Sequence, residues 1–160
     1  MLGEDLISAA AYGPDGSRFA VGGVLGRVTL WDGAVRARLG VLDGTTSDPT
    51  TDATGGVTAL AFPPDGRTLA VAGAGGTPHL WDLASQTLPG TALPSPGDDI
   101  RALGFAPDGT LYDSGGHVPV LRRDLRPDRL IGGVCERAGS GLSEAAWKTC
   151  LQDLPYRRTC

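Results

Sequence analysis

The sequence predicts an all-β fold in which three similar β-sheet units are followed by a short helical tail. Gly and Pro supply 25 and 12 of the 160 residues, which indicates many short strands joined by tight turns. A Pro-Asp-Gly turn occurs three times, each time after an apolar segment. All three cysteines and a net excess of basic residues lie within residues 120–160, whereas residues 1–119 are acidic. The tail is therefore expected to be a separate unit.

Each repeat begins with an apolar strand and a tight turn. The predicted strands cover residues 6–12, 57–62 and 100–105, and the turns follow at 13–16, 63–66 and 106–109. In such a turn Pro presets φ, Asp hydrogen-bonds to the nearby backbone, and Gly accepts a positive φ. Neither face of residues 57–62 is polar, which predicts a strand buried on both sides. The repeated turn residues are assigned a structural role; they are Asp15, Gly16, Asp65, Gly66, Asp108 and Gly109.

Each repeat continues with two further strands. In the second repeat these are residues 68–72 and 79–82, joined by the Gly-rich link 73–76. The third strand ends in Trp31-Asp32 and Trp81-Asp82, but in Arg123-Asp124 in the last repeat. A weaker fourth strand is expected at 36–42 and 87–93, and none in the third repeat. Four antiparallel strands per unit of about 43 residues are typical of one β-propeller blade.

These residues resemble the WD40 family, over about residues 5–124. The resemblance implies an incomplete propeller of about three blades, at residues 5–42, 57–93 and 100–124, and a role in binding other proteins. The Gly-His dipeptide that the family carries before the first strand is replaced by Gly55-Gly56 and Asp98-Asp99. The acidic residue usual in the turn before the third strand is also missing. The buried His–Asp–Ser/Thr–Trp network of typical blades is therefore not expected.

Three blades are too few to close a propeller, which needs about four to eight. The apolar faces of the end blades are then left open, and repeat proteins cover such ends with caps or with partner chains. Three arrangements are compatible with the sequence. The chain is the C-terminal part of a larger propeller, or it completes a ring with itself or another chain, or it is an open array with capped ends.

The tail, residues 125–160, is predicted to hold two short helices. Pro127 suits the first turn of one helix, and Ser143 suits the N-cap of the other. The tail resembles the C-terminal extension of bacterial WD40 proteins in a set of residues that comprises Cys135, Trp147, Pro155, Tyr156, Arg157 and Cys160. Cys135 and Cys160 are compatible with a disulfide or with two buried thiols, and a reducing cytosol favours the thiols.

No group of residues predicts catalysis, a cofactor or a metal site. Asp113, Ser114 and His117 include the residue types of a hydrolase triad, but they surround a Gly115-Gly116 turn that favours a surface loop. The link 73–76 lacks the Gly-Lys-Ser/Thr ending of a phosphate-binding loop. His79 is expected on a sheet face, and neither the histidines nor the cysteines have zinc-site spacing. The acidic insert 43–56 lacks the spacing of a calcium loop.

Protein–protein interaction is the leading functional prediction; the alternative is a structural piece that completes a ring with another chain, or a degenerate fragment without independent function. The net charge of −4 argues against nucleic acid. The chain has no apolar run of about 20 residues, so membrane association is not expected. It has no secretion signal, so a cytoplasmic location is expected. The predicted contact residues are Arg27, Asp98, Asp99 and His117. The loops expected to share one face are 22–27, 43–56, 73–78, 98–99 and 114–119.

Overall fold

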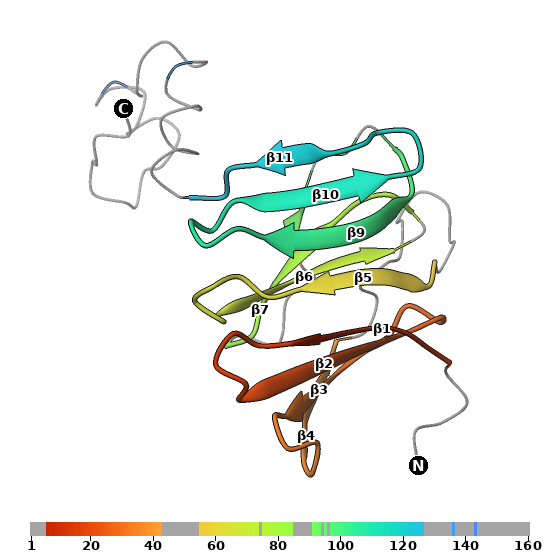
Figure 1. Ribbon diagram of the computed structural model, residues 1–160, viewed down its shortest axis with the longest axis vertical. Helices are drawn as coiled ribbons and strands as arrows, with labels where there is room; N and C mark the ends of the chain where they lie inside the picture. Colours follow the sequence, from red (N-terminus) through yellow and green to blue (C-terminus); the bar gives the residue numbers. More distant parts are fainter. Residues whose placement is uncertain are drawn as a thin grey trace. The chain divides into compact units, whose positions relative to one another are not determined.

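The computed structural model describes residues 6–42, 55–73, 75–84, 91–93, 95, 97–126, 136 and 143. The chain divides into two compact units, Met1–Arg123 and Asp124–Cys160. In the first unit the described strands form three antiparallel sheets (Figure 1), so the predicted all-β class with three WD40-like blades is confirmed. The two predicted tail helices lie outside the described residues, as do the tail residues Cys135, Trp147, Pro155, Tyr156, Arg157 and Cys160.

Each sheet is a simple meander in which neighbouring strands follow one another in the chain. The first sheet has the order β1-β2-β3-β4, the second β5-β6-β7-β8 and the third β9-β10-β11. The strands are β1 (Ile7–Tyr12), β2 (Arg18–Gly23), β3 (Val28–Asp32), β4 (Arg38–Leu42), β5 (Val57–Ala61), β6 (Thr68–Gly73), β7 (His79–Asp82), β8 (Thr91–Ala92), β9 (Ile100–Phe105), β10 (Leu111–Gly115) and β11 (Leu121–Arg123). A fourth strand is present in the first two sheets, as predicted.

The three Pro-Asp-Gly turns have the same hydrogen bond. In each one Oδ1 of the aspartate accepts the backbone N–H two residues further on, from Ser17, Arg67 and Thr110 at 2.9–3.0 Å. The following glycines, Gly16, Gly66 and Gly109, have φ between 62° and 81°, where a side chain is strained. The turn sequence therefore recurs because each hairpin needs the same backbone.

The aspartates of the Trp-Asp pairs also hold backbone. Oδ1 of Asp32 accepts the N–H groups of Arg36 and Ala37 at 2.6 Å, and Oδ1 of Asp82 accepts that of Ala84 at 2.9 Å. The hydrogen bond from Ala37 is the main reason that the pKa of Asp32 lies below its ordinary value. These carboxylates close the turn at the end of the third strand.

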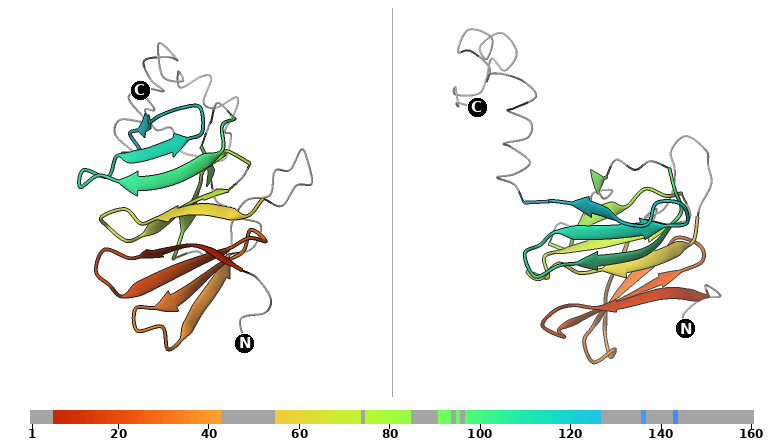
Figure 2. Two further views of the ribbon diagram at one scale, coloured as in Figure 1. Left: turned by 45° about the vertical axis from the view of Figure 1, so that its right-hand side comes forward. Right: turned by 45° about the horizontal axis from the view of Figure 1, so that its top comes forward.

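The sheets pack face to face (Figure 2). We call the face that packs on the next sheet the forward face, and the face that packs on the preceding sheet the rear face. The core between the first two sheets joins two sets of buried residues. The forward face of the first sheet contributes Ala20, Val28, Leu30 and Leu42, with Ala9 and Ala11 packed against them; the rear face of the second sheet contributes Leu60, Leu69, Val71 and Trp81.

The first strands of successive sheets are joined by side-chain hydroxyls. Ser8 donates to the carbonyl of Val57 at 2.6 Å, and Thr58, at the equivalent place one repeat later, donates to the carbonyl of Ile100. Thr58 is exposed, whereas the rest of β5 is buried, so the prediction of a strand buried on both sides holds for all but this residue. At Gly22 a Cβ would lie 2.5 Å from Val57 Cγ1, which shows how closely the two sheets approach.

Candidate functional site

One end of the first unit gathers the β2–β3, β6–β7 and β10–β11 turns and the loops that precede β5 and β9; we call it the loop end. Its described parts touch one another at several places. A Cβ on Gly56 would lie 2.8 Å from the carbonyl oxygen of Val24, and one on Gly76 would lie 2.5 Å from that of Asp98. The turn of one sheet therefore lies against the loop that leads into the next sheet.

Asp98 holds the turn between β10 and β11. Its Oδ2 accepts the backbone N–H groups of His117 and Val118, each at 2.7 Å, and its Oδ1 lies 3.1 Å from His117 Nδ1. The Asp98 side chain is only 10% exposed, whereas that of His117 is 94% exposed. The backbone N–H groups of Val118 and His117, in that order, hold the pKa of the Asp98 carboxyl well below its ordinary value. Asp98 thus fixes the turn while His117 projects into solvent.

The four predicted contact residues therefore differ in position. The structure brings Asp98 and His117 together and turns Asp98 inward, whereas Asp99 and Arg27 are exposed. Three exposed apolar side chains lie on the same turns, and the sequence analysis did not single them out; they are Val24, Leu25 and Val120. Arg101 on β9 was also missed: a Cβ on Gly116 would lie 3.6 Å from Arg101 Nη2. The insert residues 43–54 lie outside the described residues.

The residue types of a triad are present near this end, but they do not form one. Asp113 accepts two hydrogen bonds from Arg123, and the His117 ring lies beside Asp98. His79 is half-buried on β7. Among the described residues, no group of three His, Cys, Asp or Glu side chains is placed to hold a metal ion. The described part of the chain also has no helix with the length and hydropathy of a membrane span.

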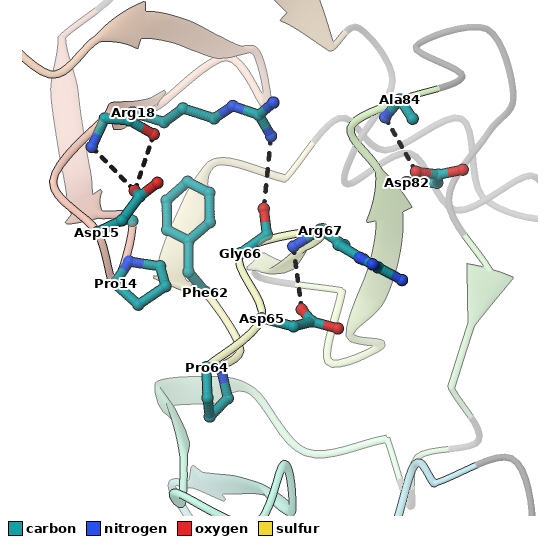
Figure 3. A pocket seen from close by; sticks show the side chains of 12 residues that line it. Pro14, Asp15, Arg18, Phe62, Pro64, Asp65, Gly66, Arg67, Asp82 and Ala84 are labelled. Atoms are coloured by element: carbon teal, nitrogen blue, oxygen red, sulfur yellow. Dashed lines mark hydrogen bonds between the residues drawn. The ribbon is translucent and has the colours of Figure 1, made fainter.

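A groove of about 720 Å³ lies at the opposite end of the sheets, between the first two Pro-Asp-Gly turns (Figure 3). Pro14, Phe62 and Pro64 line it, and Arg18 reaches across to the carbonyl of Gly66 at 3.4 Å. The carboxylates in its wall are those that cap the turns, Asp15, Asp65 and Asp82. These turns were predicted to be purely structural, although the Pro and the charged residues that repeat in both indicate a groove at this place.

The second repeat is similar to a known family of repeats. Residues 43–82 match the model of the WD domain, G-beta repeat. This segment includes the Pro-Asp-Gly turn at Pro64 and the Trp81-Asp82 pair. No curated protein matches the chain. The matched segment includes strands β5 to β7 of the second sheet, and the first and third sheets repeat their order and turns. Residues 43–82 are therefore identified as a WD40 repeat, and the other two sheets resemble it in strand order and turns.

Proposed function

We propose that this chain is a protein-interaction scaffold that binds another polypeptide at its loop end. WD40 repeats generally mediate protein–protein contacts and are generally not catalytic. The observation that carries the proposal is the pair of hydrogen bonds that the Asp98 carboxylate accepts from the backbone N–H groups of His117 and Val118. These hydrogen bonds give the β10–β11 turn one defined shape in the free chain.

A fixed loop favours binding because less conformational entropy is lost when the partner arrives. Loops on a rigid scaffold commonly carry recognition for the same reason. Here the rigid part is the sheet, and the close approaches at Gly56 and Gly76 link the turns of adjacent sheets. The loop end therefore offers a surface that is formed before the partner binds.

The chemistry of this surface combines apolar and polar groups. Leu25 and Val120 are exposed apolar side chains, and Asp99 and His117 are exposed polar ones. Protein interfaces typically place apolar contacts at the centre and polar groups at the rim. We infer a polypeptide partner that covers Leu25 and Val120 and places hydrogen-bonding groups opposite Asp99 and His117.

Crosslinking of the full chain in lysate tests this proposal. A photoreactive residue is placed at position 117, and a matched one at the exposed position 67 at the other end. We expect one discrete adduct from position 117 and none of that mass from position 67. The adduct from position 117 should be lost when Leu25→Ser and Asp99→Ala are combined. Equal adducts from both positions, or an adduct from 117 that survives the double change, would count against the loop end.

A further inference from the structure

We propose that two copies of this chain join head to tail into one six-bladed ring. In each of the two junctions, the rear face of the first sheet of one copy packs on the forward face of the third sheet of the other. The junctions inside the chain supply the template, because each open face has counterparts that are already packed. The proposal concerns the faces of the sheets and is independent of the loop end.

The rear face of the first sheet is open and apolar. Ile7 is 60% exposed, whereas its counterparts Val57 and Ile100 are 1% and 3% exposed. In the second sheet the rear-face residues Leu69, Val71 and Trp81 are buried. Their counterparts in the first sheet are only half-buried; they are Phe19, Val21 and Trp31. Exposed apolar surface of this extent is typical of an interaction site.

The forward face of the third sheet has the small residues that such a junction needs. Ala102 and Gly104 occupy the places of Ala9 and Ala11, which pack against the second sheet. A Cβ on Gly104 would meet no atom of the described residues within 4 Å, so the described sheets leave the space in front of it open. Small residues on this strand let the next sheet approach closely, as at the internal junctions.

Some residues on the two open faces differ in size and polarity from their counterparts at the junctions inside the chain. On the forward face Tyr112 and Arg122 occupy the places of Ala20 and Leu30. On the rear face of the first sheet Ala10 occupies the place of Leu60. The rings of Tyr12 and Phe19 stack there with centroids 4.4 Å apart. We infer that Tyr112 and Arg122 of one copy fit beside Ala10 and the two rings of the other, since aromatic rings suit both a tyrosine and a guanidinium.

The hydrogen bonds between first strands point to the same junction. Ser8 and Thr58 each donate to a carbonyl on the next sheet. Arg101 is their counterpart on β9, and its side chain is exposed. The counterpart of the two accepting carbonyls is that of Ile7 on β1. We infer that Arg101 of one copy donates to the Ile7 carbonyl of the other. Closed propellers have about four to eight blades, so two copies of the three described sheets fall within this range, whereas three copies exceed it.

The solution mass of the full chain by light scattering tests the ring. We expect twice the chain mass of 16.4 kDa. Gly104→Leu fills the open space on the forward face, and Ile7→Arg places a charge on the rear face. Each should give a folded monomer with unchanged circular dichroism. Arg67→Glu is the control, because Arg67 is exposed at the end of the sheets opposite the loop end; this variant should remain a dimer.

Mixing the two variants separates head-to-tail packing from other dimers. In a mixed dimer the unchanged rear face of the Gly104→Leu copy packs on the unchanged forward face of the Ile7→Arg copy, so one of the two junctions is intact. The mixed dimer should therefore form with at least tenfold higher affinity than the dimer of either variant alone. A dimer of rear face on rear face gives no such gain and would overturn the proposal. A monomeric or polydisperse wild-type chain would also overturn it, as would dimers insensitive to both substitutions. Crosslinking from position 117 to another protein would not rescue it.

Discussion

The guanidinium of Arg123 forms a two-point ion pair with the carboxylate of Asp113, with Nε–Oδ1 and Nη2–Oδ2 distances of 3.0 Å. The Asp113 side chain is 2% exposed and that of Arg123 is 14% exposed. In the second sheet the same places hold Val71 and Trp81. The third blade has therefore replaced an apolar pair by an ionic pair at the same point in the sheet.

Changing Arg123 to Trp alone should destabilise the chain by about 3 kcal/mol, because Asp113 stays buried without its partner. Changing Asp113 to Val as well restores the pair found in the second sheet. The double variant should then lie within about 1 kcal/mol of the wild type. Urea denaturation of the wild type, both single variants and the double variant measures this cycle. If the double variant loses the sum of the two single losses, the residues are not acting as a pair.

Two glycines with positive φ separate backbone strain from close packing. Gly76 and Gly97 have φ of 71° and 84°, but only Gly76 lies against the Asp98 carbonyl. Gly97→Ala should cost about 1 kcal/mol from strain alone. Gly76→Ala should cost at least about 2 kcal/mol more, because the loop that carries Asp98 must move. Thermal unfolding compares the two, and equal losses would mean that the approach at Gly76 is relaxed in solution.

The pKa of Asp98 predicts a dependence of stability on pH. The folded chain lowers this pKa, so Asp98 in its ionised form stabilises the fold at all pH values above the ordinary aspartate pKa of about 3.9. That contribution falls as the pH drops from about 4 towards the lower pKa of the folded state. The wild type should exceed Asp98→Asn in stability at pH 7 by more than at pH 3.

Asp99→Asn is the control for the pH series, since it removes one carboxylate from an exposed neighbouring position. Denaturant titrations at pH 7, 5, 4 and 3 give both differences. A gap between wild type and Asp98→Asn that widens towards pH 3 has the wrong sign and would exclude the proposed role of the carboxylate.

Trp81 is buried, and its Nε1 has no hydrogen-bond partner among the residues that the structure describes. Trp81→Ala should cost about 3–5 kcal/mol, because it removes a large side chain from the core between the first two sheets. Trp81→Phe should cost markedly less, since it keeps most of the ring and removes the unpaired donor. Urea denaturation followed by circular dichroism gives both values. Equal losses for the two variants would show that the indole N–H is bonded in solution.

The repeat pattern predicted the fold because each element has a local cause. The expected strand 79–82 coincides with β7, and the expected strand 68–72 differs from β6 by one residue. The fourth strand was expected at 36–42, and β4 begins two residues later, at Arg38. The described part of the strand expected at 87–93 is limited to Thr91–Ala92. Turn chemistry and strand periodicity determine these features within a few residues.

The candidate site was harder to predict because its contacts join distant positions. Asp98 and His117 are 19 residues apart, and Asp113 and Arg123 are ten apart. Their pairing depends on strand register and on the bulge between Ser114 and Gly115, which no residue pattern specifies. Asp98 was therefore predicted as a partner contact, and its hydrogen bonds to the backbone of the His117 turn were not predicted. The groove beside Phe62 could not be predicted for the same reason, because it forms only when two turns from different sheets lie side by side.

The aspartates that make this family recognisable are all engaged with their own chain. Asp15, Asp65 and Asp108 close hairpins, and Asp32 and Asp82 close the turns that follow. Selection for a folded blade is enough to maintain them, whatever the protein binds. Exposed side chains at the loop end, such as Asp99 and Val120, can change with each new partner. Two descendants of one such array would thus keep the same signature while their ligands diverge.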